Sequence, residues 1–134
     1  MTHDYYLEVR GSELDSFGHV NNAVYISYLE ECRWKFFDEM NWLGYLKKEG
    51  IFPVVVETNI RYIRELKMLD KVVIKTHWRT EGEYMITDHT IYIAGTSKKV
   101  AKAVGKMIFV SIDRVVHELP DFIKNTINSE ENTA

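Results

Sequence analysis

The order of the predicted elements constrains the fold of this chain most, because one long helical segment is followed by a series of strand-like segments. Over residues 22–42, apolar side chains recur every three or four positions, which is the spacing of one face of an α-helix. The segments that follow alternate between apolar and polar residues and are separated by short turns, which join antiparallel neighbours. We predict an α+β fold with one antiparallel sheet, of about five strands, wrapped around one long helix.

The predicted helix has two faces. Its apolar stripe consists of Tyr25, Tyr28, Leu29, Cys32, Phe36 and Met40. The polar remainder, which includes Glu30, Glu31 and Arg33, is expected to face solvent. We therefore expect the apolar stripe to fill the inside of the sheet.

The predicted strands lie before and after this helix. A first short strand covers residues 5–10, and the later ones cover residues 54–63, 71–80, 84–94 and 100–112. Gly50 and Pro53 are expected to separate the helix from the first of these later strands. Residues 120–127 favour a short helix. We predict one domain over residues 1–128 and a polar, frayed tail over residues 129–134.

The composition disfavours several functional classes. A hydrophobic fraction of 46% among 134 residues indicates a folded core rather than a disordered chain. A net charge of -3 gives no general attraction to nucleic acid. The five histidines show no zinc-site spacing and no Gly-rich nucleotide loop is present, so we expect neither a metal nor a cofactor.

The sequence also carries no signal for export. The N-terminal residues lack the basic and then apolar pattern of a secretory signal, and no apolar stretch reaches membrane-spanning length. The one cysteine, Cys32, cannot form an internal disulfide. We expect a cytoplasmic protein without a membrane span.

The segment from Leu14 to Tyr25 places a carboxylate, Asp15, just ahead of the predicted helix start. Asn22 is predicted to cap that helix, whose first N–H groups have no partner in the helix and can stabilise an oxyanion. A carboxylate beside the same carbonyl can attack it or activate water. The simpler alternative is that Asp15 begins a β-turn that Gly18 ends, and spacing alone leaves both open.

The run Asp-x-x-Gly-His-Val-Asn-Asn from Asp15 to Asn22, with Tyr-Leu-Glu-Glu-Cys-Arg after it, resembles the signature of hotdog-fold acyl-CoA thioesterases. Within the hydroxybenzoyl-CoA thioesterase family, the chain is most similar to the branch that includes bacterial long-chain acyl-CoA thioesterases. The resemblance implies the hotdog fold, hydrolysis of a fatty acyl-CoA by Asp15, and carbonyl polarisation by the backbone amide near Asn22. His19 also matches a motif position, where it can orient the loop or contact the substrate.

The resemblance further implies a homodimer, paired again into a tetramer, with the site between two subunits. An apolar cleft for the acyl chain is expected around Phe17, Gly18, Tyr25 and Tyr28. Partner residues Glu57, Thr58 and Asn59 are the candidates for the facing wall. Arg61 and Arg64 are candidates for the CoA phosphates, although Glu65 stands where the family commonly has proline and leaves that assignment open.

Other functions remain possible for this pattern. One alternative is a non-catalytic acyl-CoA-binding hotdog protein, which needs no reactive carboxylate. Another is a thioesterase that acts on acyl-carrier protein, which needs the same chemistry as hydrolysis of acyl-CoA. A hotdog dehydratase or hydratase requires a catalytic histidine and a helical carboxylate. Another thioesterase branch also uses a helical carboxylate, but we favour a solvated or structural role for Glu30 and Glu31.

Overall fold

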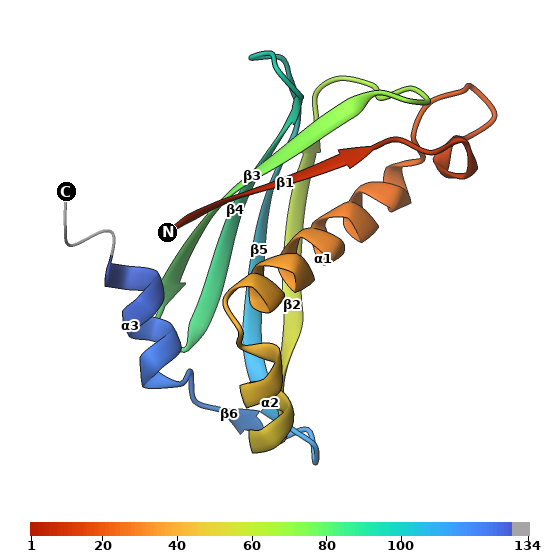
Figure 1. Cartoon of the computed structure of the whole chain (residues 1–134). Coiled ribbons are helices and arrows are strands. Elements are labelled where there is room, and N and C mark those ends of the chain that lie inside the picture. The colour runs from red at the N-terminus through yellow and green to blue at the C-terminus, as the bar shows by residue number, and fades with distance from the viewer. Residues whose placement is uncertain (130–134) are drawn as a thin grey trace.

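The fold is a single curved antiparallel sheet with one long helix, α1 (Asn22–Glu39), lying against its inner face (Figure 1). The computed structural model describes residues 1–129. The strand order is β1-β3-β4-β5-β2, with β6 paired to β5, so the sheet has six strands. The strands are β1 (Thr2–Glu8), β2 (Ile51–Tyr62), β3 (Lys71–Glu81), β4 (Tyr84–Ile93), β5 (Lys99–Ser111) and β6 (Val116–His117). The predicted α+β architecture is confirmed.

Two glycine turns connect the central strands. Gly82 joins β3 to β4 with φ 60°, and Gly95 joins β4 to β5 with φ 75°. Side chains other than glycine rarely adopt a positive φ, so these residues fix the positions of the hairpins. This local chemistry explains why the strand bounds in this region lie within one or two residues of those that the sequence predicts.

The strands β1 and β2 form the two edges of the sheet. The prediction that Gly50 and Pro53 precede β2 was wrong for Pro53, because the strand begins at Ile51 and pairs Pro53 with Phe109. A proline lacks the N–H donor that a central strand needs, and an edge strand tolerates that loss. A β-bulge between Val55 and Glu57 then breaks the regular alternation of β2.

The helix α1 ends earlier than the prediction of residue 42. Asn41 has a φ of 61°, a left-handed conformation that stops the helix after its C-cap, Met40. A separate short helix, α2 (Leu43–Glu49), follows it and was not predicted. The first strand was also placed too late, because pairing with β3 starts at Thr2.

The C-terminal helix α3 spans Asp121–Ser129, so the predicted short helix is present and continues two residues further. A 3-10 turn, η1 (Gly11–Glu13), precedes α1 and was not predicted. Of the tail predicted to be frayed, Ser129 belongs to α3, and residues 130–134 lie outside the described part of the chain.

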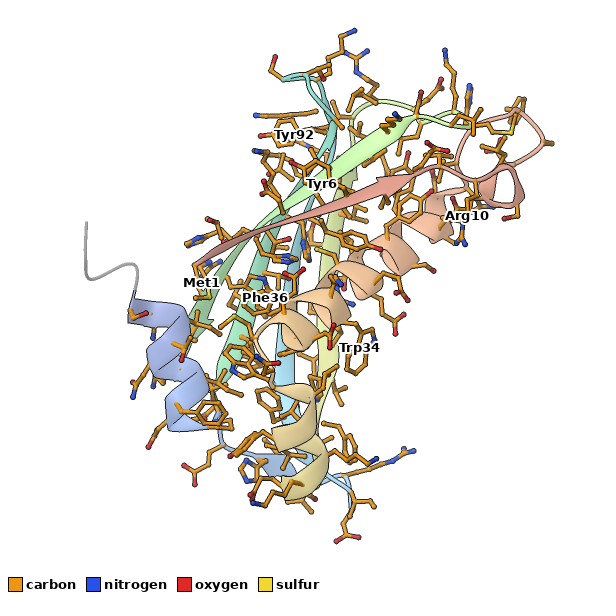
Figure 2. All side chains as sticks on the ribbon, viewed as in Figure 1. Met1, Tyr6, Arg10, Trp34, Phe36 and Tyr92 are labelled. Atoms are coloured by element: carbon orange, nitrogen blue, oxygen red, sulfur yellow. The ribbon has the colours of Figure 1, made fainter. Side chains whose placement is uncertain are left out.

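The buried side chains divide into two clusters along α1. Around its first half, Tyr25, Leu29 and Cys32 pack with aliphatic residues of the central strands. Around its second half the cluster is aromatic, and the rings of Phe36 and Trp78 stack with 4.2 Å between their centroids. Figure 2 shows Phe36 and Trp34 on opposite sides of α1, with Trp34 on the side of β2. The second cluster also holds α2 and α3 against the sheet.

Candidate active site

The candidate site lies where the loop before α1 meets the segment between β2 and β3. The Val20 N–H donates to the Leu66 carbonyl over 2.9 Å, and His19 forms a β-bridge with Lys67. Figure 1 shows the loop before α1 and the segment between β2 and β3 near the start of α1, at the end of the molecule opposite α2. Two segments distant in sequence are thus fixed side by side.

The loop before α1 makes a tight turn at Asp15. The Asp15 N–H donates to the His19 carbonyl over 2.7 Å, and the Gly18 N–H donates to the Asp15 carbonyl over 3.1 Å. Gly18 has a φ of 79°, which requires glycine in practice. Asp15 therefore begins a β-turn, as the simpler interpretation of the sequence expected.

The Asp15 carboxylate uses only one of its oxygens in this turn. Oδ1 accepts hydrogen bonds from the backbone N–H groups of Phe17, at 2.8 Å, and His19, at 3.2 Å. No group among residues 1–129 donates to Oδ2, and the side chain is exposed. The turn and a reactive carboxylate are therefore compatible in the same residue.

The helix cap is one residue earlier than predicted. Asn21, not Asn22, has the extended cap conformation, and its Oδ1 accepts from the Ala23 N–H over 2.9 Å. Asn22 is already helical, so its side chain cannot cap. The Asn22 N–H itself donates to no acceptor in the described part of the chain. It is a free backbone donor at the positive end of α1.

A cavity of about 510 Å³ connects these groups. Its lining consists of Asp15, Phe17, His19, Val20, Asn22, Tyr25, Tyr62, Ile63, Arg64 and Glu65. The predicted site residues Asp15, Phe17, His19, Asn22, Tyr25 and Arg64 are among them, whereas Gly18 shapes the turn and does not line the cavity. A carboxylate, a free backbone donor and an aromatic wall therefore share one space.

Tyr62, Ile63 and Glu65 line the cavity although the sequence did not suggest it. The Tyr62 hydroxyl donates to the Asn22 carbonyl over 2.9 Å, and its ring meets Tyr25 with 5.1 Å between centroids. Burial, followed by the nearby Tyr62, raises the pKa of Tyr25 to about 12. Tyr25 therefore remains neutral at physiological pH, and the two tyrosines hold the end of β2 against the start of α1.

His19 faces a second carboxylate. Its Nε2 lies 3.1 Å from Oε2 of Glu65, which forms an ion pair when the imidazole is protonated. The only sequence signal for this contact was that Glu65 replaces a common proline of the family. The pair lies beside Asp15 in the same cavity.

Tyr28 lies outside this cavity. Its hydroxyl donates to Oε1 of Glu13 over 2.8 Å, and both residues line another cavity with Tyr5 and Arg10. Burial acts to raise the pKa of Glu13, but hydrogen bonds from the Arg10 N–H and the Tyr28 hydroxyl outweigh it and lower the pKa. The Glu13 carbonyl accepts from the Asn21 N–H over 3.0 Å, so this network supports the helix start.

The β2 residues predicted to contact substrate lie away from the cavity of the same chain. Glu57 is opposite Lys106 in the sheet, and Thr58 lines a space between α1 and β2. Asn59 and Arg61 line a hollow with Lys102. Only another subunit can bring Glu57, Thr58 and Asn59 to Asp15, as the prediction assumed.

Glu30 and Glu31 are both exposed and line different hollows on α1. Within residues 1–129, no group of three or more His, Cys, Asp or Glu side chains is placed to bind a metal ion. No helix in that range has the length and apolar character needed to span a membrane.

Comparison with known proteins gives this geometry a context. The model of the thioesterase-like superfamily matches residues 9–127. The long-chain acyl-CoA thioesterase FadM of Escherichia coli K12 is 33% identical over 108 residues, which cover 80% of each protein. The chloroplastic acyl-acyl carrier protein thioesterase ATL3 of Arabidopsis thaliana is 28% identical over 81% of this chain and 58% of the relative.

A solved structure establishes the fold independently. The 1,4-dihydroxy-2-naphthoyl-CoA thioesterase Slr0204 of Synechocystis superimposes with a TM-score of 0.86 at 16% identity, over 98% of both chains. The family match covers the loop with Asp15, the start of α1 and the end of β2. With its hotdog fold, the chain therefore belongs to the thioesterase-like superfamily of thioester hydrolases.

Proposed function

We propose that this protein hydrolyses long-chain acyl-CoA to a free fatty acid and CoA, with Asp15 as the reactive carboxylate. The observation that carries the proposal is that Asp15, whose Oδ2 is free, and Asn22, whose N–H is free, line the same cavity. A thioester carbonyl between them has a donor for its oxygen and a carboxylate for its carbon or for a water molecule. The 33% identity to FadM supports the acyl-CoA class and the long chain.

The reaction has two routes that this geometry supports equally. In the first, Oδ2 attacks the carbonyl carbon, the C–S bond breaks, and CoA leaves as a thiolate. Water then cleaves the mixed anhydride and regenerates Asp15. In the second, Asp15 takes a proton from water, and the water oxygen attacks the carbonyl carbon and displaces CoA thiolate. The thiolate then takes the proton from Asp15, which regenerates the carboxylate. In both routes the Asn22 N–H binds the developing oxyanion.

His19 has a secondary role in the proposal. Its backbone N–H holds Asp15 Oδ1, and its ring approaches Glu65 on the opposite wall of the cavity. We assign it to positioning the Asp15 loop and contacting the substrate, not to bond cleavage.

The two ends of the substrate have different surroundings. Phe17 is 82% exposed at the cavity, and with Tyr25, Tyr62 and Ile63 it offers an apolar wall for the acyl chain. Arg64 lies at the same cavity and can meet a CoA phosphate. Arg61 is farther away in this subunit, and its phosphate contact requires a substrate that extends over the sheet or to a partner.

The proposal includes a homodimer that associates further into a tetramer. The unpaired backbone groups of edge strand β2 are flanked by exposed Val54, Val55 and Val56. Such an edge is an aggregation hazard unless another strand covers it. A second copy supplies that strand and brings its Glu57, Thr58 and Asn59 toward the exposed Asp15. The buried thiol of Cys32 accords with the cytoplasmic location that we expect.

A thiol-release assay tests this function. The protein should release CoA from acyl-CoA esters, with kcat/KM rising from short to long chains, and Asp15→Asn should abolish most of the release. Binding of acyl-CoA without release by the wild-type protein would instead support the non-catalytic alternative.

The similarity to the plant acyl-acyl carrier protein thioesterase supports one competing substrate. The same assay should therefore compare acyl-CoA with acyl-carrier protein at equal chain length. If kcat/KM is at least ten times higher for acyl-carrier protein than for acyl-CoA, acyl-carrier protein is the preferred substrate.

A further inference from the structure

Arg33 is a buried cation without a bonded partner. It was expected on the solvent side of the helix, yet its residue is only 8% exposed. No hydrogen bond or ion pair joins it to any of residues 1–129. A buried charge normally has a counter-charge, because removing an ion from water is costly. The position therefore requires an explanation.

The Arg33 side chain lines a cavity of about 310 Å³ between α1 and β2. The cavity contains one carboxylate, Glu30, which is exposed and lies one helical turn before Arg33. Its remaining walls are largely apolar, with Ile26, Trp34, Phe37, Pro53, Val55, Thr58 and Met107. Figure 2 shows Trp34 directed to this side of α1. One acid and one base thus line an otherwise largely apolar cavity.

The cavity lies beside the middle of β2, where a two-fold axis would pass if two copies paired through this strand. Val55 and Thr58 flank the bulge at the middle of β2, and they face Glu30 and Arg33 across the cavity. If β2 pairs antiparallel with β2 of a second copy, the two-fold axis passes near the middle of the strand. The two α1 helices then lie antiparallel on the same face of the joined sheet, and their Glu30–Arg33 segments are opposite each other.

We propose that Arg33 pairs with Glu30 of the partner subunit across this axis, while Glu30 pairs with the partner's Arg33. An acid and a base one helical turn apart are self-complementary under a two-fold rotation, because the acid of each subunit faces the base of the other subunit. Glu30 of the same helix already acts on the Arg33 guanidinium electrostatically, but no side chain of the described residues bonds to it. The contact gives each buried guanidinium a directly paired carboxylate and covers the apolar wall around it. This inference extends the dimer proposed above and does not depend on the thioester chemistry.

An anionic ligand fits this cavity less well. Glu30 would repel a second carboxylate or a phosphate next to Arg33, whereas the reciprocal pair leaves no charge unmatched. Val55, one of the exposed valines of β2, also lines the cavity, so one partner covers the cavity and this part of the strand.

Charge reversal on separate chains tests the pairing. Glu30→Arg alone and Arg33→Glu alone each place like charges across the axis, and each should weaken self-association at least about 100-fold. Mixing the two variants should restore association to within about tenfold of the wild type, because the arginine introduced in one chain then meets the glutamate introduced in the other. Sedimentation velocity measures all three. Glu31→Arg is the matched control, since the exposed Glu31 does not line this cavity and should leave association unchanged.

A second measurement remains informative if a single variant fails to fold. A chain carrying both Glu30→Arg and Arg33→Glu should associate with itself but not with the wild type. An interaction within one helix predicts free mixing of these two chains, because each chain would satisfy its own pair. Free mixing, dimeric single variants or a monomeric wild type would each overturn the inference. Thioesterase activity is a separate readout, so failure of the proposed reaction is distinguishable from failure of this pairing.

Discussion

Asp15 uses one carboxylate oxygen in its turn and leaves the other without a donor among the described residues. One holds the Phe17 and His19 N–H groups, and the other is free in the cavity. Asp15→Asn should retain the turn, because the amide oxygen accepts the same bonds. We expect kcat to fall about 10² to 10⁴-fold, the usual range for losing a general base, with an almost unchanged midpoint of thermal unfolding. Activity within a few-fold of the wild type would remove Asp15 from the mechanism.

Substitutions of the adjacent Asn21 and Asn22 should distinguish the side chain that caps α1 from the backbone N–H proposed as the oxyanion donor. Asn21→Ala removes the side-chain acceptor for Ala23 and should lower the free energy of unfolding by about 1 kcal/mol. Asn22→Ala keeps the backbone N–H and should leave both stability and kcat close to the wild type. Urea unfolding and steady-state kinetics on the pair check this, and the opposite ranking of stabilities would contradict the assigned cap.

Glu13 should make stability depend on acid pH. Its folded pKa lies below the ordinary value of 4.5, so its contribution is complete above about that pH and is lost as pH falls through the folded pKa. The difference in unfolding free energy between wild type and Glu13→Gln should therefore shrink as pH falls from 5 toward 3. The exposed Glu8→Gln is the control, and urea titrations across this window should show no such trend for it.

At the scale of elements, local sequence determined the predictions that succeeded. The hairpins were foreseeable because Gly82 and Gly95 supply conformations that few other residues adopt. The helix end was missed because Asn41 takes a left-handed conformation that many asparagines do not. The start of β2 was missed because Pro53 is compatible with a strand only at an edge, and edge position is a property of the whole sheet.

The candidate site shows the same limit. The residues from Asp15 to Tyr25 were found together because they are contiguous and form a recognisable motif. Tyr62 and Glu65 were missed because contacts distant in sequence bring them to the cavity: Tyr62 bonds to the start of α1, and Glu65 meets His19 in the loop before it. Arg33 was assigned to solvent because helical periodicity alone says nothing about what lies beside each face.

The close approach of β4 and β5 predicts how a substitution between them affects stability. A Cβ atom added at Gly105 in β5 would lie 2.7 Å from Oγ1 of Thr87 in β4. Gly105→Ala should therefore lower the free energy of unfolding by about 1 to 3 kcal/mol, the usual range for overpacking. The same change in a Thr87→Ala background should cost less, because the clashing atom is gone. Equal costs in the two backgrounds, measured by urea unfolding, would contradict a direct contact.

For the whole molecule, activity should depend on protein concentration. The exposed Asp15 and the uncovered β2 edge make us expect an active site that a second copy completes. Dilution below the dimer dissociation constant should reduce activity per subunit, and sedimentation at the same concentrations should show monomer. A monomer with full specific activity would refute the shared site.

The separation of the two core clusters has an evolutionary consequence. The aromatic cluster around Phe36 and Trp78 anchors α2 and α3 at one end, whereas the loop with Asp15 and the end of β2 meet at the other. The residues that line the cavity at Asp15 are therefore separate from those of the aromatic cluster. We expect a lineage with this scaffold to tolerate substitutions around that cavity in small steps, because each one leaves the aromatic cluster unchanged.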